Sequence, residues 1–347
     1  MLKTLLGWKR KLPDIEPYTR EFPSTSTEED IYYCFRLLLN RNPGDKEWSG
    51  HRLTAGTDLQ ELVSKFLHSK EFKSRKQITS SLNETRHEII ETVEGFRICI
   101  SKSDKVCGSL LDNRKYASAV TSIIKRVLSE GMSFVDIGAN IGYFTLLAST
   151  IVKDSGNVFA IEPYPYNLKL LNINLMLNAC RNVEVLPFAL SNRKGFLNYD
   201  DNLGNSGNVF EIEPSIESML DSVLVYAVRL DDLLASNQQV DLIKMDIEGA
   251  EYLALQGMQK LIERDQPIII SEFSVDFLRY VSHVSPQDYL SLLLQDKTYQ
   301  LAVIRGVNNL EFCGRDMDKL IGLFNNGDSM CMDIVAYPMT RHALLFK

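Results

Sequence analysis

One stretch of the sequence combines glycines, an amide and an acid at a spacing that could do chemistry. It is Val135-Asp-Ile-Gly-Ala-Asn-Ile-Gly-Tyr-Phe-Thr145, in which Gly138 and Gly142 remove side chains where the backbone must turn tightly and let a ligand approach. Asn140 tolerates unusual dihedral angles and offers an amide, and Asp136 can meet a cation. Because an apolar run precedes these residues, we expect them at the turn from a strand to a helix.

The spacing of these glycines separates two classes of ligand. Gly138-x-x-x-Gly142 is not the G-x-G-x-x-G pattern that binds the pyrophosphate of a dinucleotide. S-adenosylmethionine has no phosphate, and its positive sulfonium and amino groups suit an acid at Asp136. A nicotinamide-dependent oxidoreductase is the competing interpretation. A third interpretation, in which the glycines only pack a helix against a strand, also stays open.

Acids also follow the next expected strands. Glu162, in Ile161-Glu-Pro163, lies about 20 residues beyond Gly142, and an acid there can accept both hydroxyls of a ribose. Asp246, Glu248 and Glu251 cluster between a buried strand and a helix. They could bind the methionine end of a cofactor, deprotonate an acceptor hydroxyl or hold a divalent metal. Capping of the following helix is the structural alternative for these acids.

Two further charged residues belong to the same rim of the expected sheet. Lys244 precedes Asp246 and is expected to pair with one of the acids. Glu272 ends another apolar run, so it would reach the rim that holds Asp246. For a hydroxyl acceptor, we expect Asp246 first, and Glu272 second, to be the catalytic base.

An alternation of strands and helices must position these residues. Strands are expected at 133–137, 157–162, 183–188, 241–246 and 267–273, and helices at 116–128, 142–151, 166–178 and 250–262. Short apolar strands that alternate with amphipathic helices imply an α/β fold with a mostly parallel sheet and helices on both faces. Near the end, 299–304 and 330–336 are expected to form an antiparallel hairpin with no helix needed between them.

The segment before this fold is expected to be a separate helical domain over residues 28–75. Thr27 and the acids after it form a helix start, and an apolar stripe at helical spacing runs through residues 59–67. Residues 1–27 would be an N-terminal segment and linker, and residues 76–94 a linking helix. The domain resembles the DUF4214-like helical domains of bacterial glycan-modifying enzymes in Tyr33, Arg36, Arg41, Pro43, Asp45, Trp48, Gly56 and Phe72, with Asn40 where that family usually has glycine.

Composition excludes several classes of protein. The chain has 347 residues and a formal net charge of −7, so it lacks the basic footprint of a nucleic-acid-binding protein. It contains no apolar run long enough to form a transmembrane segment. Its six cysteines are scattered without the spacing of a zinc site, which favours reduced thiols and a cytoplasmic location.

The catalytic region resembles a known family over residues from about 95 to 338, the FkbM-like methyltransferases. The resemblance rests on 134–145, Ala160-Ile-Glu-Pro163, Asn172-x-Asn174 with Asn178, Ala189-Leu-Ser191, Leu230-Asp-Asp-Leu233, 241–251 and Pro267 with Glu272. It implies a Rossmann-like class I methyltransferase domain over 95–347, with seven strands in the order 3-2-1-4-5-7-6. The implied cofactor is S-adenosyl-L-methionine.

The same resemblance implies roles for individual residues. The cofactor site would contain Asp136, Gly138, Asn140, Gly142, Tyr143 and Glu162, with Ala189 near the adenine. The usual activity is O-methylation of sugars, polyketides and other natural products, and the helical domain favours a glycan acceptor and glycan-biosynthesis partners. An acceptor loop is expected at 200–207. The intact acids count against a non-catalytic binding module, which is the remaining alternative.

Overall fold

The protein divides into two compact units, Met1–Thr85 and Arg86–Lys347. The computed structural model describes residues 25–35, 39, 42–67, 69–71, 87–102, 108–200, 208–211, 223–295, 298–327 and 329–346. Residues 1–24 of the expected N-terminal segment, Phe72, residues 76–86 of the expected linking helix and residues 201–207 of the expected acceptor loop lie outside the described residues.

The described part of the smaller unit consists mainly of helices. Its first helix, α1 (Glu28–Tyr33), begins with a capping box in which Thr27 Oγ1 accepts from the Asp30 backbone N–H and Asp30 accepts from the Thr27 N–H. The other described helices are α2 (Asp45–His51), the 3-10 turn η2 (Arg52–Thr54) and α3 (Leu59–Leu67). Their buried core contains Ile31, Cys34, Phe35, Leu39, Leu62 and Phe66.

An eight-stranded mixed sheet is the centre of the larger unit. Its strands are β3 (Ser133–Ile137), β4 (Asn157–Ile161), β5 (Val183–Leu186), β10 (Leu242–Met245), β11 (Ile268–Phe273), β12 (Tyr299–Gly306), β13 (Asn309–Gly314) and β14 (Met332–Pro338). They lie in the order β13-β12-β14-β11-β10-β3-β4-β5. The five strands β11, β10, β3, β4 and β5 are parallel to one another. Each of the remaining pairs, β11 with β14, β14 with β12 and β12 with β13, is antiparallel. This order confirms the expected class I arrangement, to which β13 adds an eighth strand.

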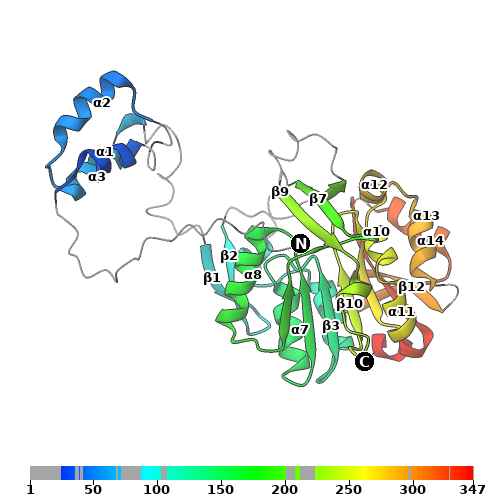
Figure 1. Cartoon of the computed structure of the whole chain (residues 1–347). Coiled ribbons are helices and arrows are strands. Elements are labelled where there is room, and N and C mark those ends of the chain that lie inside the picture. The colour runs from blue at the N-terminus through cyan, green and yellow to red at the C-terminus, as the bar shows by residue number, and fades with distance from the viewer. Residues whose placement is uncertain are drawn as a thin grey trace, which may run out of the picture. The chain divides into compact units, whose positions relative to one another are not determined.

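Helices cover both faces of this sheet (Figure 1). One face packs against α6 (Ser118–Val127), α7 (Tyr143–Val152), α8 (Pro165–Leu177) and the hairpin of β1 (His87–Glu91) and β2 (Arg97–Ser101). The opposite face packs against α10 (Glu251–Gln256), α11 (Gln259–Asp265), α13 (Pro286–Leu293) and α14 (Met317–Asn325). Shorter elements are α5 (Gly108–Asn113), η3 (Leu230–Asp232), α12 (Val275–Phe277), η4 (Leu278–Ser282) and η6 (Met339–Phe346). The inner strands β3, β10 and β11 are therefore buried on both sides, which explains their continuous apolar runs.

A second, smaller sheet follows β5 along the chain. It consists of β6 (Ala189–Leu190), β7 (Gly195–Asp200), β8 (Asn208–Glu211) and β9 (Val223–Val228), in the order β6-β9-β7-β8. The Leu230-Asp-Asp-Leu233 motif comes directly after it. Asp231 accepts hydrogen bonds from the backbone N–H groups of Lys260 and Leu261, so this motif holds the start of α11.

Three expectations about elements need correction. Residues 87–91 of the expected linking helix are strand β1, because their side chains alternate between the two faces of a hairpin with β2. The expected helix at 250–262 breaks into α10 and α11 near Gly257, where a Cβ would come within 2.1 Å of the Ser191 carbonyl oxygen. Strands β12 and β14 do pair antiparallel, but β13 and α14 lie between them in the chain.

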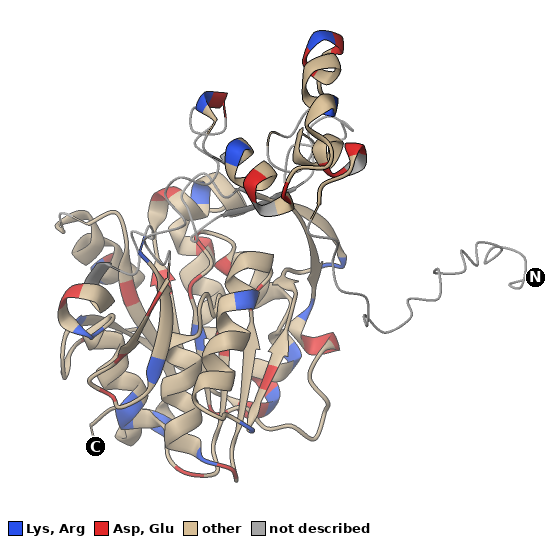
Figure 2. Ribbon diagram, turned by 90° about the vertical axis from the view of Figure 1, so that its left-hand side faces the viewer, with Lys and Arg blue, Asp and Glu red and all other residues tan. Residues whose placement is uncertain are grey.

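Charged residues of both signs are distributed along the ribbon of the larger unit (Figure 2). None of the described helices is both long enough and apolar enough to cross a bilayer.

Candidate active site

Register and strand parity bring the acids of four strands to one edge of the sheet. Lys244 in β10 lies opposite Asp136 in β3, and Glu272 in β11 lies opposite Asp333 in β14. Met245 pairs with Ser271, so Asp246, one residue beyond β10, comes level with Glu272. The face that α7 covers carries Asp136, Lys244, Glu272 and Asp333, because the apolar residues two positions away in each strand pack there. The carboxyl ends of the parallel strands therefore carry one continuous group of charges.

The glycine turn, residues 138–142, connects β3 to α7 and has three residues with positive φ. They are Gly138 at +76°, Asn140 at +51° and Gly142 at +94°. A Cβ on Gly138 would come within 2.0 Å of the Asp246 carbonyl oxygen, and one on Gly142 within 2.5 Å of Leu171 Cδ1. Glycine is thus required at both positions by close packing as well as by dihedral angle.

Every backbone N–H of the glycine turn is already engaged within the protein. Gly138 and Ala139 both donate to the Ile161 carbonyl oxygen, and Asn140 donates to Glu162 Oε2 at 2.8 Å. The N–H groups of Ile141 and Gly142 bond to Asn140 Oδ1 and to the Ala139 carbonyl. A phosphate-binding loop needs free N–H groups that point at its anion. This turn offers none, so it does not have the chemistry of a dinucleotide site.

Glu162 lies directly beside this turn, as the sequence suggested. Its side chain is 3% exposed. Oε2 accepts from the Asn140 N–H, and Oε1 accepts from the Tyr164 N–H and from Asn167 Nδ2. Burial raises the pKa of Glu162 to about 7, although the three donors act in the opposite direction. Glu162 therefore joins the end of β4, the start of α8 and the glycine turn.

The other expected cofactor residues lie deeper. Asp136 is fully buried; Thr145 Oγ1 donates to its Oδ2 at 2.6 Å, whereas Oδ1 is buried without a hydrogen-bond partner among the described residues. Burial raises the pKa of Asp136. The Tyr143 hydroxyl donates to Glu94 Oε2 at 2.8 Å, so this side chain points toward the β1–β2 turn. Ala189 is buried in β6 beside Tyr164 and Tyr199, whose rings stack at 4.7 Å.

Asp246, Glu248 and Glu272 form an acidic cluster at the ends of β10 and β11. Each offers an oxygen, and these three oxygens lie within 4.8 Å of one another. The Asp246 side chain is 34% exposed, whereas Glu272 Oε2 is buried without a hydrogen-bond partner in the described part of the chain. Burial and the charge of Asp246 raise the pKa of Glu248 to about 7 and that of Glu272 to about 9.

Glu251 has a different role from its acidic neighbours. It is 2% exposed and accepts the backbone N–H groups of Ile247 and Gly249, both at 2.9 Å. Its carboxylate thus holds the loop on which Glu248 adopts a φ of +55°. Strain of this kind is maintained only where the surroundings fix it. Glu251 therefore fixes the loop that carries Glu248, which agrees with the capping alternative for Glu251.

Asparagines on α8 complete the support, and their structural role was not anticipated. Asn174 is fully buried; its Oδ1 accepts the Cys99 N–H, and its Nδ2 donates to the carbonyls of Ile141 and Cys99. Asn178 makes the same pair of contacts with Arg97. The two side chains pair with β2 as a neighbouring strand would, which places the hairpin beside α8 (Figure 1). The spacing of four residues on one helix was the available signal.

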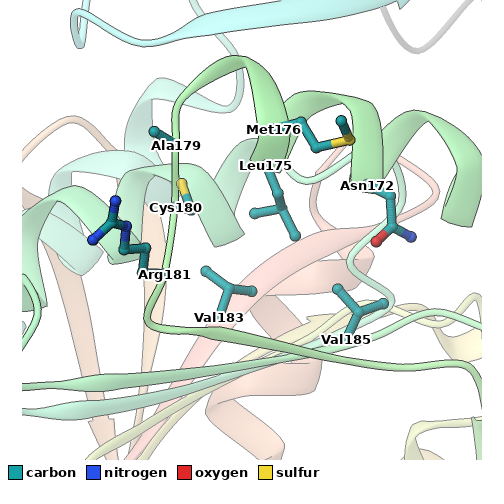
Figure 3. A pocket seen from close by; sticks show the side chains of 8 residues that line it. All are labelled: Asn172, Leu175, Met176, Ala179, Cys180, Arg181, Val183 and Val185. Atoms are coloured by element: carbon teal, nitrogen blue, oxygen red, sulfur yellow. The ribbon is translucent and has the colours of Figure 1, made fainter.

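A pocket of about 460 Å³ lies elsewhere on the larger unit (Figure 3). It is lined by residues of α8, of β5 and of the chain between them, including Met176, Arg181 and Val185. None of the acids described above lines it. We therefore place the candidate active site at the carboxyl ends of the strands, where ligands bind in open α/β sheets.

Comparison with known proteins gives a family match within the larger unit. Residues 136–301 match the family model described as the methyltransferase FkbM domain, a span that includes the glycine turn, Glu162 and the acidic cluster. Together with the sheet order, this match defines the larger unit as a class I methyltransferase. More specifically, residues 136–301 resemble the FkbM-type methyltransferase domain.

Individual relatives are similar to this chain at low identity. Methyltransferase sdnD of Sordaria araneosa is 29% identical over 198 residues, which cover 48% of this chain and 73% of that protein. The solved methyltransferase FkbM of Methylobacillus flagellatus is 17% identical with a TM-score of 0.40, over 88% of this chain and 58% of that chain. A SAM-dependent methyltransferase of Aquifex aeolicus is 16% identical with a TM-score of 0.36, over 67% of this chain and 94% of that chain.

Proposed function

We propose that the larger unit transfers a methyl group from S-adenosyl-L-methionine to a hydroxyl of a sugar or a related natural product. The observation that carries this proposal is the row of acids at the carboxyl ends of β3, β4, β10 and β11. A donor with a sulfonium and an ammonium group is favoured beside such acids, because opposite charges attract strongly where water is excluded. The engaged N–H groups of the glycine turn argue against a dinucleotide in the same place.

In this proposal, Glu162 and the glycine turn bind the donor. The free lone pairs of the Glu162 carboxylate accept the ribose hydroxyls, while its existing bonds to Asn140 and Tyr164 keep it in place. Gly138, Asn140 and Gly142 let the methionine end of the donor approach the backbone. Asp136, buried in β3, contributes negative charge. Tyr143 supports the turn through its bond to Glu94, and Ala189 borders the adenine.

Asp246 is the proposed catalytic base. The acceptor oxygen attacks the methyl carbon in line with the breaking S–C bond, its proton passes to Asp246, and S-adenosylhomocysteine leaves with a neutral sulfur. Alignment of the two reactants can supply roughly 7–11 kcal/mol of the barrier. Glu272, whose pKa is raised to about 9, holds a proton at neutral pH. It therefore donates a hydrogen bond to the acceptor more readily than it removes a proton.

The carboxylates of the acidic cluster also fit a divalent metal ion. Asp246, Glu248 and Glu272 would hold it, since hard cations prefer oxygen ligands at this spacing. A bound ion would lower the pKa of an acceptor hydroxyl. Retention of activity in excess EDTA identifies direct base catalysis, whereas loss that Mg²⁺ or Mn²⁺ restores identifies a metal-assisted reaction.

The nature of the acceptor rests on the N-terminal unit. The DUF4214-like resemblance of residues 28–75 links the chain by analogy to cytoplasmic glycan assembly. The test is transfer of a labelled methyl group from S-adenosylmethionine to a panel of glycans, polyketides and lipids, followed by mass spectrometry. Methylated sugars support the proposal, and transfer to no hydroxyl compound contradicts it.

One substitution tests the role of Asp246. Asp246→Asn removes the base and keeps the size of the side chain, so kcat should fall by roughly 10²–10⁴-fold. The affinity for S-adenosylhomocysteine, measured by calorimetry, should change little. Asp232→Asn, at an exposed acid paired with Lys194, is the control and should leave kcat unchanged. An Asp246→Asn enzyme with full activity would exclude Asp246 as the base.

A further inference from the structure

A buried lysine lies at the centre of the acids. Lys244 is 6% exposed and lies opposite Asp136 in the register of β10 and β3. Its Nζ is 3.2 Å from Asp246 Oδ2 and 5.1 Å from the centre of the Phe144 ring in α7. A lysine is rarely buried to this degree unless its charge is paired. The charge of Lys244 and the charges of the neighbouring acids therefore stabilise each other.

The charges around Lys244 come from every neighbouring strand. Asp136 lies on β3, Glu272 on β11 and Asp333 on β14, and Asp246 and Glu248 follow β10. The positive charge of Lys244 lowers the pKa values of Asp136, Glu248 and Asp333 against the effect of burial. Burial opposes the charged form of Lys244, but Asp246, Asp136 and Tyr116 raise its pKa beyond the ordinary value. At neutral pH this side chain is an ammonium ion.

The ion pair involves one particular oxygen of Asp246. Lys244 contacts Oδ2 of Asp246, and the structure describes no hydrogen bond to Oδ1. Lys244 thus holds one oxygen of this carboxylate from the protein side, and the Asp246 side chain is 34% exposed. A base must be oriented by a further group to reach its proton reproducibly. Lys244 is placed to provide that orientation.

We propose that Lys244 is a positioning residue: its ammonium group, paired with Asp246 and placed opposite Asp136 in the sheet register, fixes the Asp246 carboxylate toward the acceptor and allows several acids to share one site. This inference rests on the proposed function, because it assigns Lys244 to the reaction of Asp246. Lys244 does not touch the reacting atoms. It acts through Asp246, so its effect must disappear when Asp246 is changed.

The experiment compares Lys244→Met and Lys244→Arg with the wild type. Lys244→Met should lower kcat by roughly 30-fold or more. Lys244→Arg retains the charge and should restore most of the activity. S-adenosylhomocysteine affinity, measured by calorimetry, reports that each variant is folded. Lys194→Met is the matched control, since Lys194 makes an exposed pair with Asp232 at the same 3.2 Å.

A double-mutant cycle separates a positioning role from a structural one. In the Asp246→Asn background, adding Lys244→Met should change kcat by less than about twofold. This double variant also removes both charges together, so it keeps the site balanced if Lys244→Met alone fails to fold. Independent effects of the two substitutions on kcat overturn the inference.

Failure of the proposed function gives a different result. A wild-type protein that transfers no methyl group to any acceptor contradicts the methyltransferase assignment itself. The same cycle is then measured by urea unfolding. Additive effects of Lys244→Met and Asp246→Asn on stability would overturn the coupling between the two residues as well.

Discussion

The acidic residues of the site divide into two kinds by what they contact. Glu162 and Glu251 are almost completely buried, and their oxygens accept backbone N–H groups. Asp246 is partly exposed and contacts a lysine. Since buried carboxylates with backbone donors fix loops, the first kind shapes the site and the second is free to react. Carboxylates at the same edge of the sheet therefore serve two purposes: some fix loops, and Asp246 is available for the proposed reaction.

Glu162→Ala tests a residue that is proposed both to fix the glycine turn and to bind the cofactor. It removes the acceptor of the Asn140 and Tyr164 N–H groups together with the proposed partner of the ribose. We expect the affinity for S-adenosylhomocysteine to fall by roughly 10–100-fold, equivalent to about 1.4–2.8 kcal/mol. Calorimetry provides the measurement, and Glu184→Ala on the exposed side of β5 is the control. Unchanged affinity would refute the assignment of Glu162 to the cofactor site.

At the scale of elements, the glycine turn depends on contact between two strand ends. Gly138→Ala would place a Cβ 2.0 Å from the Asp246 carbonyl oxygen at a φ of +76°. Because backbone atoms cannot yield as a flexible side chain can, we expect unfolding free energy to fall by more than about 3 kcal/mol. Urea denaturation measures the loss. Gly195→Ala, where no atom lies within 4 Å of the added Cβ, should change stability by less than about 0.5 kcal/mol.

The contact between α8 and the β1–β2 hairpin gives a second prediction for elements. Asn174→Ala leaves the buried Cys99 N–H and the Ile141 carbonyl without their partner, which should cost about 2–4 kcal/mol in urea unfolding. Asn172→Ala, on the same helix, loses only a bond to the Leu168 carbonyl at an exposed position. It should cost less than about 0.5 kcal/mol. Equal losses in the two variants would contradict the role given to Asn174.

The sequence predicted the strands of the parallel sheet almost to the residue, because apolar runs between turn residues are a local signal. It predicted the glycine turn, Glu162 and the acid-rich end of β10 for the same reason. It did not predict that Asn174 pairs with β2 or that Asp333 lies level with Glu272, since both depend on register between segments far apart in the chain. The break at Gly257 was also missed, because its cause is the approach of Ser191.

At the scale of the whole molecule, several buried acids affect the dependence of stability on pH. Burial raises the pKa values of Glu162, Glu248 and Glu251 to about 7 and that of Asp333 to about 6. Between about pH 4.5 and 7 the folded protein thus binds more protons than the unfolded chain. Stability must therefore fall as pH rises through this window.

Urea unfolding at pH 5, 6, 7 and 8 checks this expectation. The free energy of unfolding should decrease by more than about 2 kcal/mol from pH 5 to pH 7.5, because one unit of pKa shift corresponds to about 1.4 kcal/mol. Saturating S-adenosylmethionine should reduce the decrease, since its positive charges favour the ionised acids. Stability that stays level or rises over this interval would contradict the burial of uncompensated carboxyls.

The close approach of Gly138 to the Asp246 carbonyl has a kinetic consequence. The turn expected to receive the donor and the loop that carries the proposed base approach each other through backbone atoms, since a Cβ on Gly138 would meet the Asp246 carbonyl oxygen at 2.0 Å. Any adjustment of the turn on occupancy by the donor is transmitted to the base. Substrates should accordingly add in sequence, with the donor first and the acceptor second.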